Sequence, residues 1–108
     1  VDDMAAASIF MMNLDNKKYQ LVTQPMRSHV NAGSGQECQI RELVISVAAT
    51  VGFTGDIVWD KTKPDGPPRK LMSNSILTDL GWNPKISLPQ GLQRTYNWFL
   101  QNDTSLRN

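Results

Sequence analysis

Apolar residues recur at spacings of three and four in four stretches of the chain, and this periodicity predicts four helices. The first helix is capped by Asp2 or Asp3 and runs to about Leu14. The second has the most regular pattern, and Gly52 supplies the left-handed residue that ends it. The apolar face of this second helix consists of Ile40, Leu43, Val44, Val47, Ala48 and Val51.

Two further helices are predicted in the C-terminal third of the chain. Ser73 caps a short helix that runs through Leu80. Ser87, with Gln90 three residues later, forms a capping-box pattern at the start of the last helix. We expect this helix to fray from Gln101 onward, because the chain becomes polar there.

Two short stretches have the pattern of β-strands, residues 28–32 and residues 56–60. The segment between the first helix and the first strand, residues 16–27, is predicted to be a polar connector in which Pro25 prevents a helix. Because two strands are too few for an independent sheet, we expect them to extend a sheet that is formed elsewhere. The expected fold class is therefore a small α/β or α+β arrangement of about four helices and two short strands.

The composition limits the chain to one domain and excludes several functions. It has 108 residues, of which 40% are hydrophobic, enough for a modest core. The net charge of +1 gives no electrostatic reason to expect a nucleic acid or an anionic membrane as partner. Cys38 and His29 are the only residues of their types, which excludes a disulfide framework, a cysteine-based zinc site and a histidine-rich metal site.

From the given residues we expect neither a signal peptide nor a membrane-spanning helix. No stretch reaches the roughly 20 apolar residues that a membrane-spanning helix needs. The sequence begins with Val1-Asp2-Asp3, which is acidic where a signal peptide is basic. A helical pattern starts at once, and this fits equally well a piece of a longer protein or the processed terminus of a complete small domain.

The most unusual segment is residues 61–70, which combine four cations, one acid, three prolines and a glycine. Proline lowers the entropy that such a loop loses when it is held in one shape. Arginine offers a planar fork of donors and lysine a point charge, so a stiff basic loop suits phosphate. A solvated surface turn explains the same residues, and the loop by itself slightly favours that simpler interpretation.

Other polar residues are interpreted as structural. Gly33-Ser34-Gly35 lacks the G-x-G-x-x-G spacing of a dinucleotide site and predicts a turn that needs positive φ. No histidine lies near Cys38 in the sequence, so this thiol is not expected to be catalytic. Arg41 and Glu42 lie outside the apolar face of their helix and are expected on its solvated side.

Six short segments of this sequence resemble, in the same order, segments in the C-terminal part of the GDP-L-fucose synthases. These are NADPH-dependent GDP-4-keto-6-deoxy-D-mannose epimerase/reductases of the extended short-chain dehydrogenase/reductase family. The resemblance extends from Val1 to about Asn102 and leaves residues 103–108 as a polar tail. Among the six segments, the loop segment 63–70 is the most specific to this family. The six segments are Val1–Ala5, Asn31–Gly35, Ile40–Leu43, Lys63–Lys70, Leu80–Trp82 and Tyr96–Leu100.

The resemblance implies that the catalytic and cofactor-binding parts lie outside this chain. In the family, the glycine-rich fingerprint, the serine and the Tyr-x-x-x-Lys motif belong to an N-terminal Rossmann domain. Here Tyr19 and Tyr96 are followed by Val22 and Phe99 where the lysine should stand. The resemblance therefore implies no catalytic, cofactor-binding or metal-binding residue in this segment, and the chain alone should not transfer hydride.

The resemblance assigns the substrate side instead. It implies that Asp65 and Lys70 line a pocket for a GDP-sugar, with Arg69 as a second cation. Their chemistry agrees, because a carboxylate accepts hydrogen bonds from guanine or sugar hydroxyls and an ammonium suits a diphosphate. Pro67 stands where the family usually has threonine, which stiffens the loop and removes one hydroxyl.

Three functions follow from these observations. The first is the GDP-sugar-binding part of a cytoplasmic GDP-L-fucose synthase-like enzyme, whose partners are the GDP-sugar and the missing Rossmann domain. The second is a stand-alone, non-catalytic binding or interaction module. The third is another nucleotide-sugar epimerase or dehydratase, against which the loop at 63–70 argues. We also expect the first and last helices to expose apolar faces and to promote self-association into a homo-oligomer.

Overall fold

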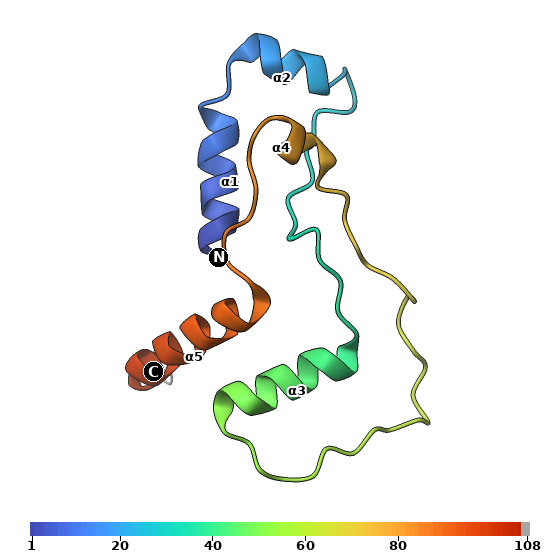
Figure 1. The fold of residues 1–108 in the computed structure, drawn as a ribbon, viewed down its shortest axis with the longest axis vertical. Coiled ribbons are helices and arrows are strands. Elements are labelled where there is room, and N and C mark those ends of the chain that lie inside the picture. Colours follow the sequence, from blue (N-terminus) through green and yellow to red (C-terminus); the bar gives the residue numbers. More distant parts are fainter. Residues whose placement is uncertain (107–108) are drawn as a thin grey trace. The chain divides into compact units, whose positions relative to one another are not determined.

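The computed structural model describes residues 1–106, within which the chain has five helices and no β-strand (Figure 1). The chain forms two compact units, each built from two segments. Unit 1 consists of Val1–Glu37 and Lys70–Lys85, and unit 2 of Cys38–Arg69 and the chain from Ile86 onward. The helices are α1 (Asp2–Met12), α2 (Asn16–Val22), α3 (Ile40–Val51), α4 (Ser75–Asp79) and α5 (Leu88–Leu106).

The predicted span of helix α1 in unit 1 is nearly correct and extends slightly too far. It ends at Met12, two residues before the expected end, and the side-chain amide of Asn13 donates a hydrogen bond to the Ile9 carbonyl at 3.0 Å. The N-cap is Val1, so the prediction of an aspartate cap is wrong. Asp2 and Asp3 occupy the first turn instead, where negative charge is favourable at the positive end of the helix dipole.

Helix α2 occupies most of the segment that was predicted to be a connector, and that prediction is wrong. Asp15 is the N-cap, and its carboxylate accepts a hydrogen bond from the Lys17 backbone N–H at 2.9 Å. The helix ends at Val22, and two reciprocal backbone hydrogen bonds then close a turn between Gln24 and Arg27. Pro25 therefore prevents a helix only close to its own position, and the residues farther upstream remain free to form one.

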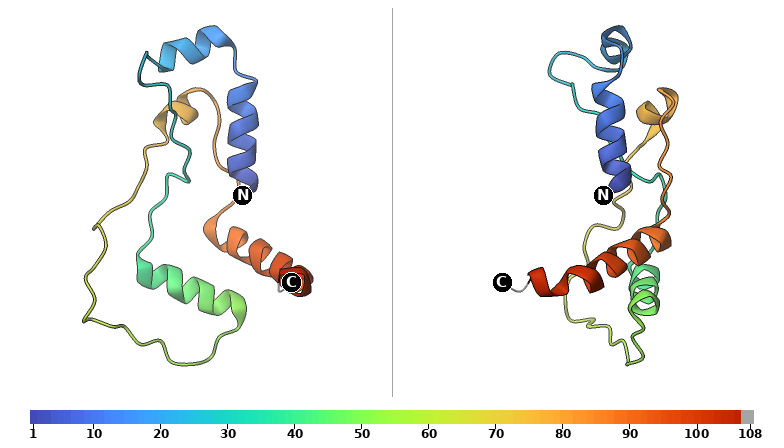
Figure 2. Two further views of the ribbon diagram at one scale, coloured as in Figure 1. Left: turned by 180° about the vertical axis from the view of Figure 1, so that it is seen from behind. Right: turned by 90° about the vertical axis from the view of Figure 1, so that its left-hand side faces the viewer.

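The packed centre of unit 1 is small and lies between α1 and α4. Among the described residues, the buried apolar ones are Ala7 on α1, 3% exposed, and Leu77 on α4, 1% exposed. The views in Figures 1 and 2 agree that the short α4 lies beside α1. The Lys85 backbone N–H donates to the Asp3 carboxylate at 3.0 Å, which ties the end of this unit back to the start of α1.

Unit 2 contains the packed pair α3 and α5. The predicted span of α3 is confirmed, and Gly52 ends it with φ 70° in the left-handed region. The predicted capping box of α5 is also confirmed, because the Ser87 N–H donates to the Gln90 side-chain carbonyl at 3.0 Å. The helix continues past Gln101, where fraying was expected to begin, and extends to Leu106. Residues 107–108 of the expected polar tail lie outside the described residues.

The two predicted strands are absent from the described chain, where residues 28–32 and 56–60 run as irregular segments. The fold class is therefore helical with long loops, and the α/β expectation with two strands is not confirmed. A strand requires a neighbouring strand to pair its backbone N–H and C=O groups. Within residues 1–106 the sole ladder-type pairing is the Gln24–Arg27 bridge, so neither segment has such a neighbour.

Many large apolar side chains remain exposed, and most of them lie in unit 2. On α3, Ile40 is 69% exposed although it belongs to the regular apolar face of that helix. Trp98 and Leu100 on α5 are 54% and 58% exposed. In residues 1–106, none of the helices combines the length and the apolar character needed to cross a lipid bilayer.

Candidate functional site

The loop of residues 61–70 is exposed along its whole length. Asp65 and Arg69, two of the residues predicted to bind substrate, lie in unit 2, whereas Lys70 is the first residue of the second segment of unit 1. The three residues are thus divided between the two units. Exposure keeps their charged groups accessible to a ligand, and none of the three lines the hollows described below.

The carboxylate of Asp60 holds the start of this loop, and we call residues 59–62 the root of the loop. Asp60 accepts two hydrogen bonds from Thr62, one from the backbone N–H at 2.9 Å and one from the hydroxyl at 2.6 Å. Both hydrogen bonds favour the charged form of Asp60 and so lower the pKa of its carboxyl below the usual value. The Thr62 hydroxyl has the larger effect and the Thr62 backbone N–H the smaller one. The turn at the start of the loop is therefore a local structure that depends on charged Asp60.

A second contact joins the same root to helix α3. The guanidinium carbon of Arg41 lies over the ring of Trp59, 5.4 Å from its centroid, which is a cation–π distance. Trp59 is 40% exposed, and the expectation that Arg41 lies on an exposed side of its helix is confirmed. The contact itself was missed, because no local pattern links two residues that are 18 positions apart in the sequence.

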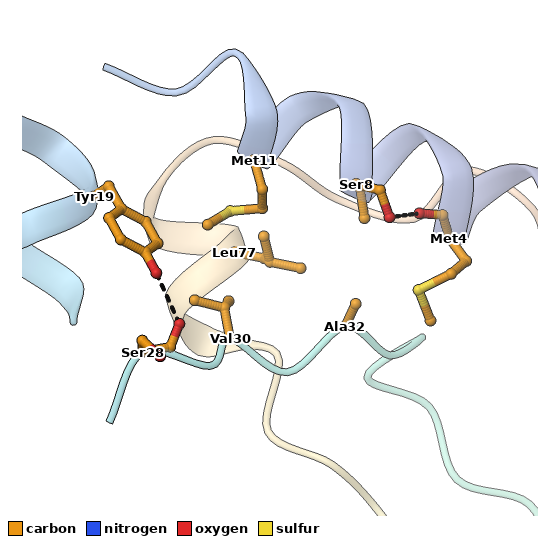
Figure 3. Close-up of a pocket in the computed structure, with 9 residues that line it drawn as sticks. Met4, Ser8, Met11, Tyr19, Ser28, Val30, Ala32 and Leu77 are labelled. Atoms are coloured by element: carbon orange, nitrogen blue, oxygen red, sulfur yellow. Dashed lines mark hydrogen bonds between the residues drawn. The ribbon is translucent and has the colours of Figure 1, made fainter. Parts of the chain in front are cut away.

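Unit 1 contains an open, mainly apolar hollow of about 300 Å³ (Figure 3). Its polar groups largely satisfy one another: the Tyr19 hydroxyl donates to the Ser28 carbonyl at 2.9 Å, and the Ser8 hydroxyl to the Met4 carbonyl at 2.9 Å. A diphosphate needs cationic or N–H donors, so this surface suits an apolar neighbour better than a nucleotide. It is lined by Met4, Ala7, Ser8, Met11, Tyr19, Ser28, Val30, Ala32 and Leu77.

A second hollow, of about 340 Å³, lies along the end of α2 and the turn that follows it, residues 20–24 with Arg27. This hollow carries one cation and is formed by a single short stretch of chain. Its local origin and single charge make it a weaker candidate for nucleotide binding than the basic loop.

The glycine turn after residue 32 has a local structural role. Gly35 has φ 67°, which confirms that the turn after residue 32 requires positive φ. The Gly33 backbone N–H donates to the Asn74 side-chain carbonyl at 3.3 Å, so this turn is used to join two segments of unit 1. Cys38 is exposed, and the described residues contain no cluster of three histidine, cysteine, aspartate or glutamate side chains that could hold a metal ion.

Relatives with assigned names match almost the whole chain. A GDP-L-fucose synthase from Escherichia coli K12 is 51% identical over 107 residues, and GDP-L-fucose synthase 1 from Arabidopsis thaliana is 51% identical over 102 residues. These matches cover 99% and 94% of this chain but 33% and 29% of the relatives. The chain thus spans about a third of the length of these relatives. It matches their C-terminal region, as the six sequence segments predicted. No family model matches the chain.

Solved structures support the same placement. A GDP-6-OMe-4-keto-L-xylo-heptose reductase from Campylobacter jejuni has a TM-score of 0.80 and 33% identity, covering 94% of this chain and 29% of its own. A GDP-D-glycero-L-gluco-heptose synthase from the same species, solved in the presence of NADPH, has a TM-score of 0.75 and 33% identity. This match covers 91% of the present chain and 28% of the synthase.

Proposed function

We propose that this chain is the substrate-binding, C-terminal part of a GDP-L-fucose synthase-like enzyme, which converts GDP-4-keto-6-deoxy-D-mannose to GDP-L-fucose with NADPH. The observation that carries the proposal is 51% identity over 107 residues to the E. coli relative. The two Campylobacter neighbours also have GDP-sugars in their names, and one was solved with NADPH present. A nucleotide-sugar substrate is thus common to the sequence and structure matches.

Within this function, Asp65, Lys70 and Arg69 bind the GDP-sugar. All three side chains are exposed on one continuous basic loop and are accessible to a ligand. The carboxylate accepts hydrogen bonds from guanine or sugar hydroxyls, and the two cations face the diphosphate. The NADPH site and the proton-transferring tyrosine belong to the partner Rossmann domain, so the 108-residue chain alone should transfer no hydride.

The test uses a chimera in which this chain replaces the C-terminal third of the E. coli relative. Asp65→Asn and Lys70→Gln should each raise the KM for the GDP-sugar roughly ten- to hundredfold, because losing a charged hydrogen-bond partner costs about 1.5–3 kcal/mol. NADPH affinity should stay unchanged, since the cofactor contacts the other domain. GDP and NADPH are titrated separately by calorimetry.

Matched controls come from the same region. Asp56→Asn and Lys61→Gln make the same chemical changes at exposed positions that the proposal does not place in the site. They should leave the KM within about twofold, as expected for surface changes. Loss of NADPH binding with intact GDP binding in Asp65→Asn contradicts the proposal and assigns the loop to the cofactor.

The second candidate is a stand-alone interaction module without catalytic activity. The exposed apolar side chains of α5, including Trp98 and Leu100, favour it, because such surfaces usually have a partner. The two functions differ in one observation: whether the gene encodes a Rossmann domain in frame upstream of Val1. A chimera that is folded but inactive with every substrate would favour the interaction module.

A further inference from the structure

Arg41 occupies an unusual place for a cation. It is the second residue of α3, where the positive end of the helix dipole disfavours positive charge. Its neighbour Glu42 accepts a hydrogen bond from the Gln39 backbone N–H at 2.8 Å, so this acid serves the helix start. The guanidinium of Arg41 instead lies over Trp59, which offers the negative face of an aromatic ring.

This contact connects the segment just before the basic loop to helix α3 of unit 2. Helix α3 packs on α5 and is closed at both ends, by the capping box at Gln39 and by the left-handed Gly52. Trp59 belongs to an irregular segment with no strand partner among residues 1–106. The contact with Arg41 therefore supplies a tertiary restraint on a segment that lacks a β-ladder to hold it.

The restraint continues along the chain toward the loop. Directly after Trp59, the carboxylate of Asp60 holds the backbone and the hydroxyl of Thr62. Pro64 then fixes one backbone angle immediately before Asp65. Asp65, whose carboxylate is proposed to bind substrate, lies six positions after Trp59, a reach of at most about 22 Å. Because the Asp60–Thr62 turn and the φ angle of Pro64 are both fixed, the position of Trp59 limits where Asp65 can lie.

We propose that Arg41 and Trp59 are positioning residues, which hold the root of the loop against α3 so that Asp65 is presented to the GDP-sugar. The proposal rests on the proposed function, because it acts through Asp65. It differs from a general stabilising role in its consequence: the contact orders the loop before the ligand binds, so it lowers the entropy lost on binding. The Arg41–Trp59 contact therefore affects the affinity for the substrate and leaves the rate of hydride transfer unchanged.

The test measures the KM for the GDP-sugar, kcat and the Kd for NADPH in the chimera. Arg41→Gln keeps the side-chain stem and removes the charge, and Trp59→Leu removes the ring. Each should raise the KM about two- to fivefold, the loss expected for one exposed cation–π contact, with kcat and the NADPH Kd unchanged. Trp59→Phe keeps an aromatic face and should retain most of the affinity. Arg27→Gln, a matched change in unit 1, should have no effect.

A double-mutant cycle with Asp65→Asn separates positioning from folding. If Arg41 acts through Asp65, Arg41→Gln should cause no further loss in the Asp65→Asn background. Additive losses, or a fall in kcat together with the melting temperature, overturn the positioning role. If Asp65→Asn raises the KM but Arg41→Gln, Trp59→Leu and Trp59→Phe do not, the positioning role fails alone. If Asp65→Asn has no effect, the proposed function fails, and the positioning role fails with it.

Discussion

Replacing Leu77 by alanine removes the most deeply buried side chain of the described structure. Leu77 is 1% exposed and lies on α4, where it lines the apolar hollow together with Ala7 and Met11 of α1. The change deletes three carbon groups from a buried position, which costs about 2.4 kcal/mol at about 0.8 kcal/mol for each group. A closed cavity would add to this cost, but the vacated space joins an open hollow of about 300 Å³ that water can enter.

We therefore expect Leu77→Ala to lower the free energy of unfolding of unit 1 by about 2.5–3 kcal/mol, near the low end of core leucine truncations. The matched control is Leu21→Ala on α2, where the same chemical change affects a side chain that is 85% exposed. That variant should lose less than about 0.5 kcal/mol.

The assay is urea unfolding followed by the fluorescence of Trp82, with Trp59 and Trp98 replaced by phenylalanine. Trp82 belongs to unit 1, and its backbone N–H donates to the Leu77 carbonyl at 2.8 Å, so its signal reports on the affected region. The midpoint should fall while the m-value stays constant. Equal midpoints for Leu77→Ala and Leu21→Ala would refute the view that α4 is anchored through Leu77.

Three further predictions concern unit 2 and the exposed surface. Gly52→Ala should cost about 1 kcal/mol, because a Cβ is strained at φ 70°, whereas Gly66→Ala, at a glycine without positive φ, should be nearly neutral in thermal melts. The lowered pKa of Asp60 means that its turn is fully stabilised above the ordinary carboxyl pKa and weakens as the pH falls through the lowered value. In an NMR titration, Thr62→Val should move that pKa back up, and an unchanged pKa would contradict the assigned cause. The isolated chain should self-associate through its exposed apolar side chains, and a monodisperse monomer in sedimentation would contradict this.

The elements that the sequence predicted correctly are those whose signals are local. The span of α3 follows from its apolar periodicity and from Gly52, and the start of α5 follows from Ser87 and Gln90. Each signal needs only residues within one or two turns of the helix, so no knowledge of the remaining chain is required. The segment at 63–70 also indicated a resemblance to the GDP-L-fucose synthases, and a relative of that name is 51% identical to this chain over 107 residues.

The errors have physical causes that are equally specific. Helix α2 was missed because the effect of Pro25 was extended too far upstream, while the cap at Asp15 was overlooked. The segments at 28–32 and 56–60 have strand composition, but strand formation depends on a partner that residues 1–106 do not supply. Composition specifies which segments can pair, and it does not provide the neighbour.

Contacts between distant residues were decided by the tertiary structure alone. Leu77 became the centre of unit 1 because α4 lies against α1, and Gly33 is held by Asn74 from a segment 41 residues away. Arg41 has the sequence signature of an ordinary solvated cation, and its contact with Trp59 exists because the chain returns past the start of α3. The sequence by itself thus determined the span of α3, the start of α5 and the turn glycines, since these depend on neighbouring residues. Burial and long-range contacts required the fold, since they depend on which distant segments the packing brings together.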